Sequence, residues 1–221
     1  MKQPIIFCDF DGTITNKDNI VNIMNQFGPP EADAIKEDIL NQRISIFEGV
    51  SRLFSLLPSS KRDDIISFVI RDAQIREGFR EFVEFTRARS LPLYIVSGGI
   101  DFFVYPLLEP FAPFAGIFCN EADFSGDHIH INFPYSCDES CSSKGCGCCK
   151  PSIIRKMSSD NHLNIVIGDS ITDLQAAKMA DVVIARDFLI KKCEELGIPY
   201  EPFETFKDCI DIIQNRLDVR V

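Results

Sequence analysis

The sequence predicts an α/β fold: a Rossmann-like parallel sheet with covering helices and a small inserted helical domain. Two observations lead to this prediction. From Gly78 onward, short apolar runs typical of buried strands alternate with helix-like segments, a pattern of parallel sheets. Before Gly78, about 60 residues show helical periodicity alone. The predicted domains are therefore an α/β core of residues 1–14 and 76–221 and a helical cap of residues 15–75.

Length and composition fit one sizeable core with a smaller appendage. The chain has 221 residues, of which 45% are hydrophobic. Lys and Arg number 23 against 33 Asp and Glu, and the net charge of -10 would repel nucleic acid and anionic membrane surfaces. We therefore expect neither as a partner, and any phosphate-binding site must be local.

The start of the chain, MKQPIIFCDFDG, is interrupted by acidic residues too early for the apolar core of a signal peptide. No run approaches the roughly 18 apolar residues of a membrane span. We therefore expect a soluble, cytoplasmic protein. The sequence leaves its oligomeric state open.

The first predicted strand is the apolar run PIIF, and two carboxylates follow it closely. Its β-branched and aromatic residues favour a strand, while Gly12 and the hydroxyl residues after it indicate a turn. Because uncompensated carboxylates beside a core are costly, Asp9 and Asp11 need a partner, and a metal cation is one candidate. The alternative is a solvated strand end.

The inserted segment is predicted to be a helical bundle. Pro29-Pro30 and Pro58 separate its pieces. Apolar residues at helical spacing would form its buried faces. These residues are Ile46, Phe47, Val50, Leu53, Phe54 and Leu57 in one helix and Ile65, Ile66, Val69 and Ile70 in the next.

The remaining core elements alternate in type. GFREFVEFTRAR and DFFVYPLLEP are predicted helices on either side of the strand LPLYIVSGG. NEADFSGDHIHINF is typical of a hairpin that turns at Ser125-Gly126-Asp127. KPSIIRKMSS and TDLQAAKMA indicate helices, and LNIVIGDS and DVVIA indicate strands.

Three predicted strands end in polar residues: IIFCDFD, YIVSGG and IVIGDS. The carboxyl ends of parallel strands meet at one edge of a sheet, so their polar residues should share one crevice. Oxygen ligands such as Asp9 and Asp169 suit Mg²⁺. The backbone of Gly98 can approach an anion, Ser97 adds a hydroxyl donor, and Lys150 adds a cation.

Four motifs in order, DFDGTIT, the Ser97 of IVSGG, Lys150 and GDSITD, resemble those of the haloacid dehalogenase superfamily of phosphohydrolases. The helical insert resembles the cap of phosphoserine phosphatase relatives. Three stretches, QPIIFCDFDGTIT, YIVSGGIDFFVYPLL and CCKP, are more narrowly similar to the methionine-salvage phosphatases that act on 2-hydroxy-3-keto-5-methylthiopentenyl-1-phosphate. A phosphoserine phosphatase-like enzyme and a catalytically silent binding protein are the alternatives.

The resemblance implies a phosphomonoester hydrolase that uses Mg²⁺ and acts on a small phosphorylated metabolite. Asp9 would be the nucleophile that forms an aspartyl-phosphate, and Asp11 would be the general acid and then the base for water. Asp9, Asp169 and the backbone carbonyl of Asp11 would hold the metal.

The resemblance also implies a phosphate site. Ser97, the amide of Gly98 and Lys150 would bind the phosphoryl oxygens. Asp173 would orient Lys150 or a metal-bound water. The three histidines, His128, His130 and His162, are interpreted as structural or surface residues.

Five of the nine cysteines crowd into SCDESCSSKGCGCC, namely Cys137, Cys141, Cys146, Cys148 and Cys149. In a chain without a secretion signal, a disulfide framework is disfavoured. Thiolates at this density suit Zn²⁺, but the spacing lacks a paired C-x₂-C knuckle. We therefore favour a reduced loop, with structural zinc and then disulfide or redox control as alternatives. In each case the loop would help to position Lys150.

Overall fold

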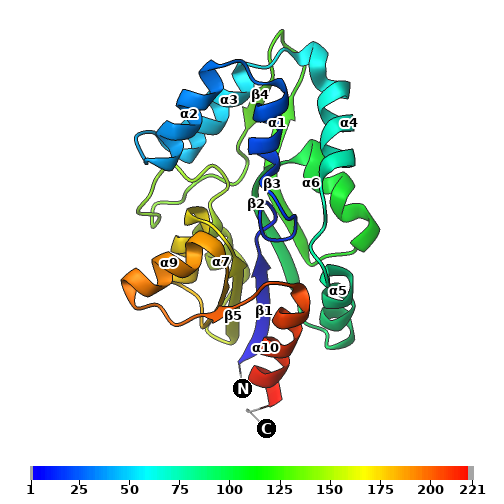
Figure 1. Ribbon diagram of the computed structural model, residues 1–221. Coiled ribbons are helices and arrows are strands. Elements are labelled where there is room, and N and C mark those ends of the chain that lie inside the picture. Colours follow the sequence, from blue (N-terminus) through cyan, green and yellow to red (C-terminus); the bar gives the residue numbers. More distant parts are fainter. Residues whose placement is uncertain (1, 219–221) are drawn as a thin grey trace.

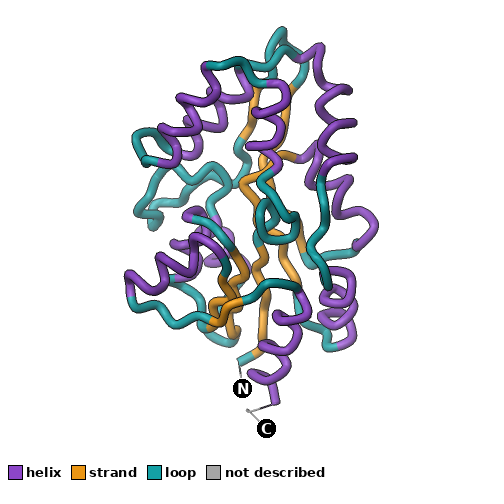
Figure 2. The backbone as a smooth tube through the Cα atoms, in the orientation of Figure 1, coloured by secondary structure: helices purple, strands orange, loops and turns teal. Residues whose placement is uncertain are grey.

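The computed structural model describes residues 2–218 and contains one mostly parallel sheet with helices on both faces (Figures 1 and 2). Within these residues the seven strands lie in the order β4-β3-β2-β1-β5-β6-β7. Only β3 and β4 pair in antiparallel fashion among the described strands. The strands are β1 (Gln3–Cys8), β2 (Leu93–Ile100), β3 (Gly116–Asp123), β4 (His130–Asn132), β5 (His162–Gly168), β6 (Val182–Ala185) and β7 (Glu201–Pro202). The predicted α/β Rossmann-like fold is confirmed.

The central strand β1 is apolar on both faces because helices cover both. Ile6 and Cys8 face a cluster that includes residues of α5 (Phe79–Ala88) and α10 (Phe206–Asp218), and α6 (Asp101–Leu108) lies on the same side (Figure 1). Ile5 and Phe7 face α7 (Lys150–Met157) and α8 (Leu174–Ala177), and α9 (Asp187–Leu196) packs beside α8. No helix in residues 2–218 is both long and apolar enough to cross a bilayer.

Four helices form the segment that was predicted to be the cap: α1 (Asn19–Phe27), α2 (Glu31–Leu40), α3 (Ile46–Ser55) and α4 (Arg62–Asp72). They lie beyond the carboxyl ends of the central strands (Figure 1). Side-chain caps start two of them, since Asp18 accepts from the N–H of Val21 and Ser45 from that of Glu48. The chain enters and leaves this segment side by side, because Thr15 and Ile75 form a β-bridge. A domain boundary at 15–75 remains our proposal.

The side chain of Phe47 departs from the predicted core face of α3. Val50, Leu53 and Phe54 are buried as expected, whereas Phe47 is 49% exposed. Its ring lies 4.4 Å from that of Phe133, between centroids. Phe47 stands in the first turn of α3, where helical spacing still aligns it with the apolar face. At that end the neighbour is the chain that follows β4, and not the interior of the bundle.

The β3–β4 hairpin reaches the helical segment. The N–H of Ile129 donates to Leu57 O at 3.0 Å, and the N–H of Ser59 donates to Asp127 O at 2.9 Å. Ile129 and Ile131 are buried, in keeping with the predicted alternation. The hairpin, which the sequence analysis assigned to the core, is therefore hydrogen-bonded to the turn between α3 and α4.

Candidate active site

The carboxyl ends of β1, β2 and β5 bring the predicted polar residues to one place. Asp9 and Asp11 follow β1, Asp169 follows β5, and Ser97 and Gly98 lie in the last part of β2. Within residues 2–218 the structure also has three short 3₁₀ turns: η1 (Ser59–Lys61), η2 (Glu109–Phe111) and η3 (Ile171–Asp173). Lys150 opens α7, and Asp173 closes η3. The structure therefore gathers all seven predicted site residues at the crevice.

Lys150 is the buried cation of this site. Its Nζ lies 2.6 Å from Asp9 Oδ1 and 2.5 Å from Asp173 Oδ1. Burial by itself would lower the pKa of Lys150, but the charges of Asp173 and Asp9 raise it above its usual value. The amine therefore stays protonated. The other oxygen of Asp173 accepts the N–H groups of Asp169 and Ser170, which fixes Asp173 in place.

Three carboxyl groups surround the single positive charge of Lys150 at this site. Oxygens of Asp9, Asp169 and Asp173 all lie within 4.8 Å of one another. Burial, and next the charge of Asp173, raises the pKa of Asp9 to about 6 although Lys150 lowers it. Burial, and next the charge of Asp9, raises the pKa of Asp169 to about 9. The charges of neighbouring carboxylates contribute to both shifts after burial, and a bound cation would offset those charges.

The donor set fits Mg²⁺, a hard cation that prefers oxygen ligands. Lys150 contacts one oxygen of Asp173 and two N–H groups donate to the other, whereas Lys150 contacts only Oδ1 of Asp9. Asp9 and Asp169 are therefore the better carboxylate ligands. Thr13 Oγ1 donates to Asp169 Oδ1 at 3.0 Å and orients it. Gly12 has φ +80°, and a Cβ there would lie 2.3 Å from Asp169 Oδ2. Only glycine allows the loop after β1 to pass so close to this carboxylate.

Asp11 is held by Asn19, the first residue of α1. Its Oδ1 accepts the Asn19 backbone N–H at 3.1 Å and the side-chain amide at 2.6 Å. Its Oδ2 lies 3.4 Å from Ser97 Oγ. Burial, and next the charge of Asp18, raises the pKa of Asp11 well above its usual value, although hydrogen bonds from Asn19 lower it. A carboxyl group with a raised pKa suits a general acid.

Ser97 and Gly98 form the side of the crevice that β2 contributes. Ser97 is fully buried, and its Oγ accepts the N–H of Gly99 at 2.8 Å. A Cβ on Gly98 would meet no atom within 4 Å, so its backbone borders open space. Asn120 Nδ2 donates to Gly98 O at 2.8 Å and holds this turn of chain from β3.

Arg76 holds the loop after β1 by hydrogen bonds to its backbone carbonyls. Its Nε donates to Thr13 O and its Nη2 to Gly12 O, both at 2.7 Å. Arg76 is 8% exposed. The groups that accept its hydrogen bonds are backbone carbonyls and not carboxylates. Burial lowers its pKa. Arg76 thus fixes the two residues that contact Asp169.

Three residues that support the site, Asn19, Arg76 and Asn120, lie outside the motifs that predicted it. Asn19 lies four residues beyond the DFDGTIT motif, where the N-cap Asp18 masks it as an ordinary helix start. Arg76 stands where the chain returns to the core, and Asn120 lies inside a strand. For Asn120, its polar side chain directly after the apolar run GIFC was the one feature of the sequence that could have indicated a role in the site.

A cavity of about 550 Å³ lies where α2 and α3 approach the core. Apolar side chains of both parts line it, among them Ile44, Ile46 and Leu174. Arg43 lines it too, but its Nε is paired with Asp38 Oδ1 at 2.8 Å. The cavity borders η3 at Thr172 and does not include the aspartates of the site.

Residues 6–178 match the family described as haloacid dehalogenase-like hydrolase. The chain belongs to this family. The predicted membership is therefore confirmed, and the match spans the helical segment and all of the predicted site residues.

Curated relatives cover the whole chain. It is 60% identical over 220 residues to a 2-hydroxy-3-keto-5-methylthiopentenyl-1-phosphate phosphatase of Geobacillus kaustophilus (strain HTA426), which spans 100% of this chain and 99% of the relative. It is 57% identical over 218 residues to the enzyme of the same name from Geobacillus thermodenitrificans (strain NG80-2), with 99% and 98% covered. Family and relatives together show an enzyme of the phosphatase class, a phosphoric monoester hydrolase.

The fold is shared with solved phosphatase structures. A phosphoserine phosphatase from T. onnurineus superposes with a TM-score of 0.72 at 17% identity, covering 97% of this chain and 96% of that one. At this identity the likeness concerns the fold alone.

Proposed function

We propose that this chain is a Mg²⁺-dependent phosphatase of methionine salvage that hydrolyses 2-hydroxy-3-keto-5-methylthiopentenyl-1-phosphate. One observation carries the chemistry: Lys150 Nζ lies 2.6 Å from Asp9, and oxygens of Asp9, Asp169 and Asp173 gather within 4.8 Å. The names of the relatives at 51 to 60% identity support the substrate. The predicted cytoplasmic location and the absence of nucleic-acid partners stay predictions.

The proposed reaction has two steps. A carboxylate oxygen of Asp9 forms a bond to phosphorus while the bond to the ester oxygen breaks, and Asp11 gives that oxygen its proton. Asp11 then takes a proton from water, whose oxygen attacks phosphorus and releases Asp9 and inorganic phosphate. The raised pKa of Asp11 supports its first role, and its hydrogen bonds to Asn19 keep it in place.

Three groups would bind the phosphoryl oxygens: the Lys150 ammonium, the Ser97 hydroxyl and the Gly98 N–H. Lys150 is held for this role by Asp173 at 2.5 Å. Mg²⁺ would be held by Asp9, Asp169 and the backbone carbonyl of Asp11, and when bound it supplies positive charge against the phosphate. With that charge, a carboxylate such as Asp9 can approach an anionic ester.

The arginines of the helical segment favour the methylthio substrate over phosphoserine. Phosphoserine brings a carboxylate that a site would pair with an arginine. Arg43 is paired with Asp38, Arg52 lies 3.5 Å from Glu48, and Arg62 and Arg71 lie over phenylalanine rings. A thioether instead needs an apolar lining, which Ile44, Ile46 and Leu174 offer in the cavity beside η3.

A screen of small phosphate esters with Mg²⁺ present tests the proposal. We expect the methionine-salvage enol phosphate to be the best substrate. Preference for phosphoserine would contradict the substrate and leave the mechanism standing. Absence of turnover with every ester, by protein shown to be folded, would favour a silent binding protein.

A further inference from the structure

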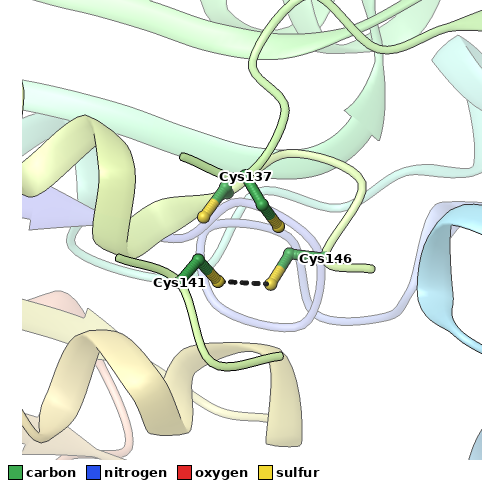
Figure 3. Close-up of side chains that lie close together, drawn as sticks. Cys137, Cys141 and Cys146 are labelled. Carbon is green, nitrogen blue, oxygen red and sulfur yellow. Dashed lines mark hydrogen bonds between the residues drawn. The ribbon is translucent and has the colours of Figure 1, made fainter. Parts of the chain in front are cut away.

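The four-cysteine cluster (Cys137, Cys141, Cys146 and Cys149) lies outside the phosphatase chemistry. Its sulfur atoms all lie within 4.8 Å of one another, and Cys141 Sγ lies 3.7 Å from Cys146 Sγ. Figure 3 shows the labelled Cys137, Cys141 and Cys146 side chains converging from separate parts of one loop. Zn–S bonds of about 2.3 Å in a tetrahedron place sulfur atoms roughly 3.8 Å apart. The cluster thus has the size of a tetrahedral thiolate site.

We propose that the four-cysteine cluster binds one structural Zn²⁺. Four soft thiolate donors in a compact group suit zinc or iron, and a site whose four positions are all filled by protein is typical of structural zinc. This proposal departs from the reduced, metal-free loop that the spacing favoured, and it takes up the zinc alternative. The absent C-x₂-C knuckle is no obstacle, because the fold and not the local spacing brings the sulfurs together.

Not every cysteine of this loop joins the cluster, so the grouping of the four sulfur atoms is not simply a result of the many cysteines in the loop. Cys148 lies in the same loop and is as buried as Cys141, at 3% exposure. Its sulfur instead points to Phe118 O at 3.7 Å and packs in the cluster under β1. All nine cysteines are free thiols in the structure, and the other four are buried singly in the core. The loop therefore directs four sulfurs to one point and one sulfur elsewhere.

The loop that carries the four-cysteine cluster has few other interactions that could hold it in one conformation. Residues 133–149 contain no helix or strand, and loops of this length are uncommon in compact domains without a function. Apart from cysteines, Phe133, Pro134 and Tyr135 are its only large apolar residues. Small segments that lack a core of their own are commonly stapled by a metal. Cys141 and Cys149 are nevertheless almost fully buried, and a metal bound by the four sulfurs would account for the fixed conformation of the loop.

Side-chain and backbone hydrogen bonds connect the four-cysteine cluster to α7. Arg155 on α7 is next to the loop and binds Asp138 in bidentate fashion, at 2.9 and 2.5 Å. Asp138 also accepts through its backbone carbonyl from the Cys141 N–H. This chain of contacts ties the cluster to α7.

The position of the cluster gives the metal a structural role between the two parts of the molecule. Cys149 is the N-cap of α7 and directly precedes Lys150. Gly145, in the same loop, accepts the N–H of Phe47 from α3 at 3.0 Å. A Cβ at Gly145 would lie 2.5 Å from Ser45 Cβ, so loop and helix touch closely. Zinc would therefore fix both Lys150 and the start of α3.

Elemental analysis of the purified full-length protein, made without a metal-binding tag, tests the proposal. We expect about one zinc per chain in the wild type and in Cys148→Ala, the control from the same loop. Cys141→Ser and Cys146→Ser should lose at least about nine-tenths of it. Zinc retained by both ligand variants, or lost from the control alone, would overturn the assignment.

A second measurement on the wild type avoids variants that fail to fold. Zinc is exchanged for Co²⁺ under reducing conditions, and the absorption spectrum is recorded. Tetrahedral thiolate coordination predicts visible ligand-field bands and near-ultraviolet sulfur-to-cobalt charge transfer. A zinc-free protein without these bands, two disulfides found by mass spectrometry, or iron in place of zinc would each overturn the proposal. None of these readouts depends on phosphatase activity.

Discussion

The ammonium of Lys150 lies 2.6 Å from Asp9 Oδ1, and both side chains are at most 6% exposed. The pair joins the start of α7 to the end of β1, two elements far apart in sequence. Removing one member of a buried pair leaves the other charge uncompensated. Lys150 has two carboxylates to compensate, so its loss is the more damaging.

Lys150→Met should reduce both stability and phosphate binding. Asp9 and Asp173 would remain buried without their cation, at a cost of about 3 kcal/mol in the free energy of unfolding. Urea unfolding measures this loss, and Lys156→Met, on the exposed side of the same helix, is the control. An unchanged unfolding midpoint for Lys150→Met would show that the pair contributes nothing to the fold.

Asp9→Asn should abolish turnover and keep the fold. The amide cannot attack phosphorus, so kcat should fall at least about a thousandfold, as for a deleted nucleophile. Steady-state kinetics and circular dichroism check the two halves. Asp63→Asn, at an exposed site on α4, is the matched control. Near-normal activity of folded Asp9→Asn would exclude the covalent mechanism.

Chelation should remove activity, and Mg²⁺ should restore it. Asp9 and Asp169 would hold the ion, and without it their charges are unrelieved. Zinc content is measured in the same samples, because loss of metal from the four-cysteine cluster is a separate event. Full activity in exhaustively chelated protein would point to metal-free hydrolysis. Asp169→Asn should require a higher Mg²⁺ concentration for half-maximal rate.

Arg76→Lys should lower activity without touching the substrate. A lysine cannot reach Thr13 O and Gly12 O together, and an unsatisfied buried carbonyl costs roughly 1 to 3 kcal/mol. The loop that contacts Asp169 should loosen, so the Mg²⁺ requirement should rise along with the loss of stability. Arg80→Lys, on the exposed side of α5, serves as control. A stable variant with an unaltered Mg²⁺ requirement would remove this role.

Substrate preference should be at least about tenfold. We expect kcat/KM for the methionine-salvage enol phosphate to exceed that for phosphoserine by this factor, a gap of roughly 1.4 kcal/mol in transition-state binding. The reason is that Ile44, Ile46 and Leu174 offer apolar surface in the cavity beside η3, while Arg43 is paired with Asp38. Both esters are measured at one Mg²⁺ concentration and pH. Equal kcat/KM values for the two esters would contradict this preference and leave the proposed phosphatase mechanism unaffected.

The structure brings the predicted site residues together because the motif residues follow strands, and their catalytic roles remain predictions. Asp9, Ser97 and Asp169 end apolar runs, and parallel strands bring such ends together. Asn19 and Arg76 could not be predicted in the same way. Their roles depend on how the helical segment returns to the sheet, and no local pattern encodes that path.

The limits of periodicity explain the remaining differences. Phe47 has the spacing of a buried residue, but its partner Phe133 comes from a distant loop. The four-cysteine cluster has an irregular spacing, yet its sulfurs converge because the loop is folded back between α3 and α7. α10 packs on α5 through Phe206, and this helix lies beyond DVVIA, the last predicted strand.

The hydrogen bonds between the β3–β4 hairpin and the turn after α3 attach the helical segment to the core at a point far from where the chain enters it. Other attachments are the β-bridge of Thr15 and Ile75 and the hydrogen bond from the Phe47 N–H to Gly145 O. An outward rotation of the helices would therefore break the bonds of Ile129 and Ser59 or carry the hairpin and the end of β3 along. A strand of the sheet itself is thus part of the attachment of the helical segment.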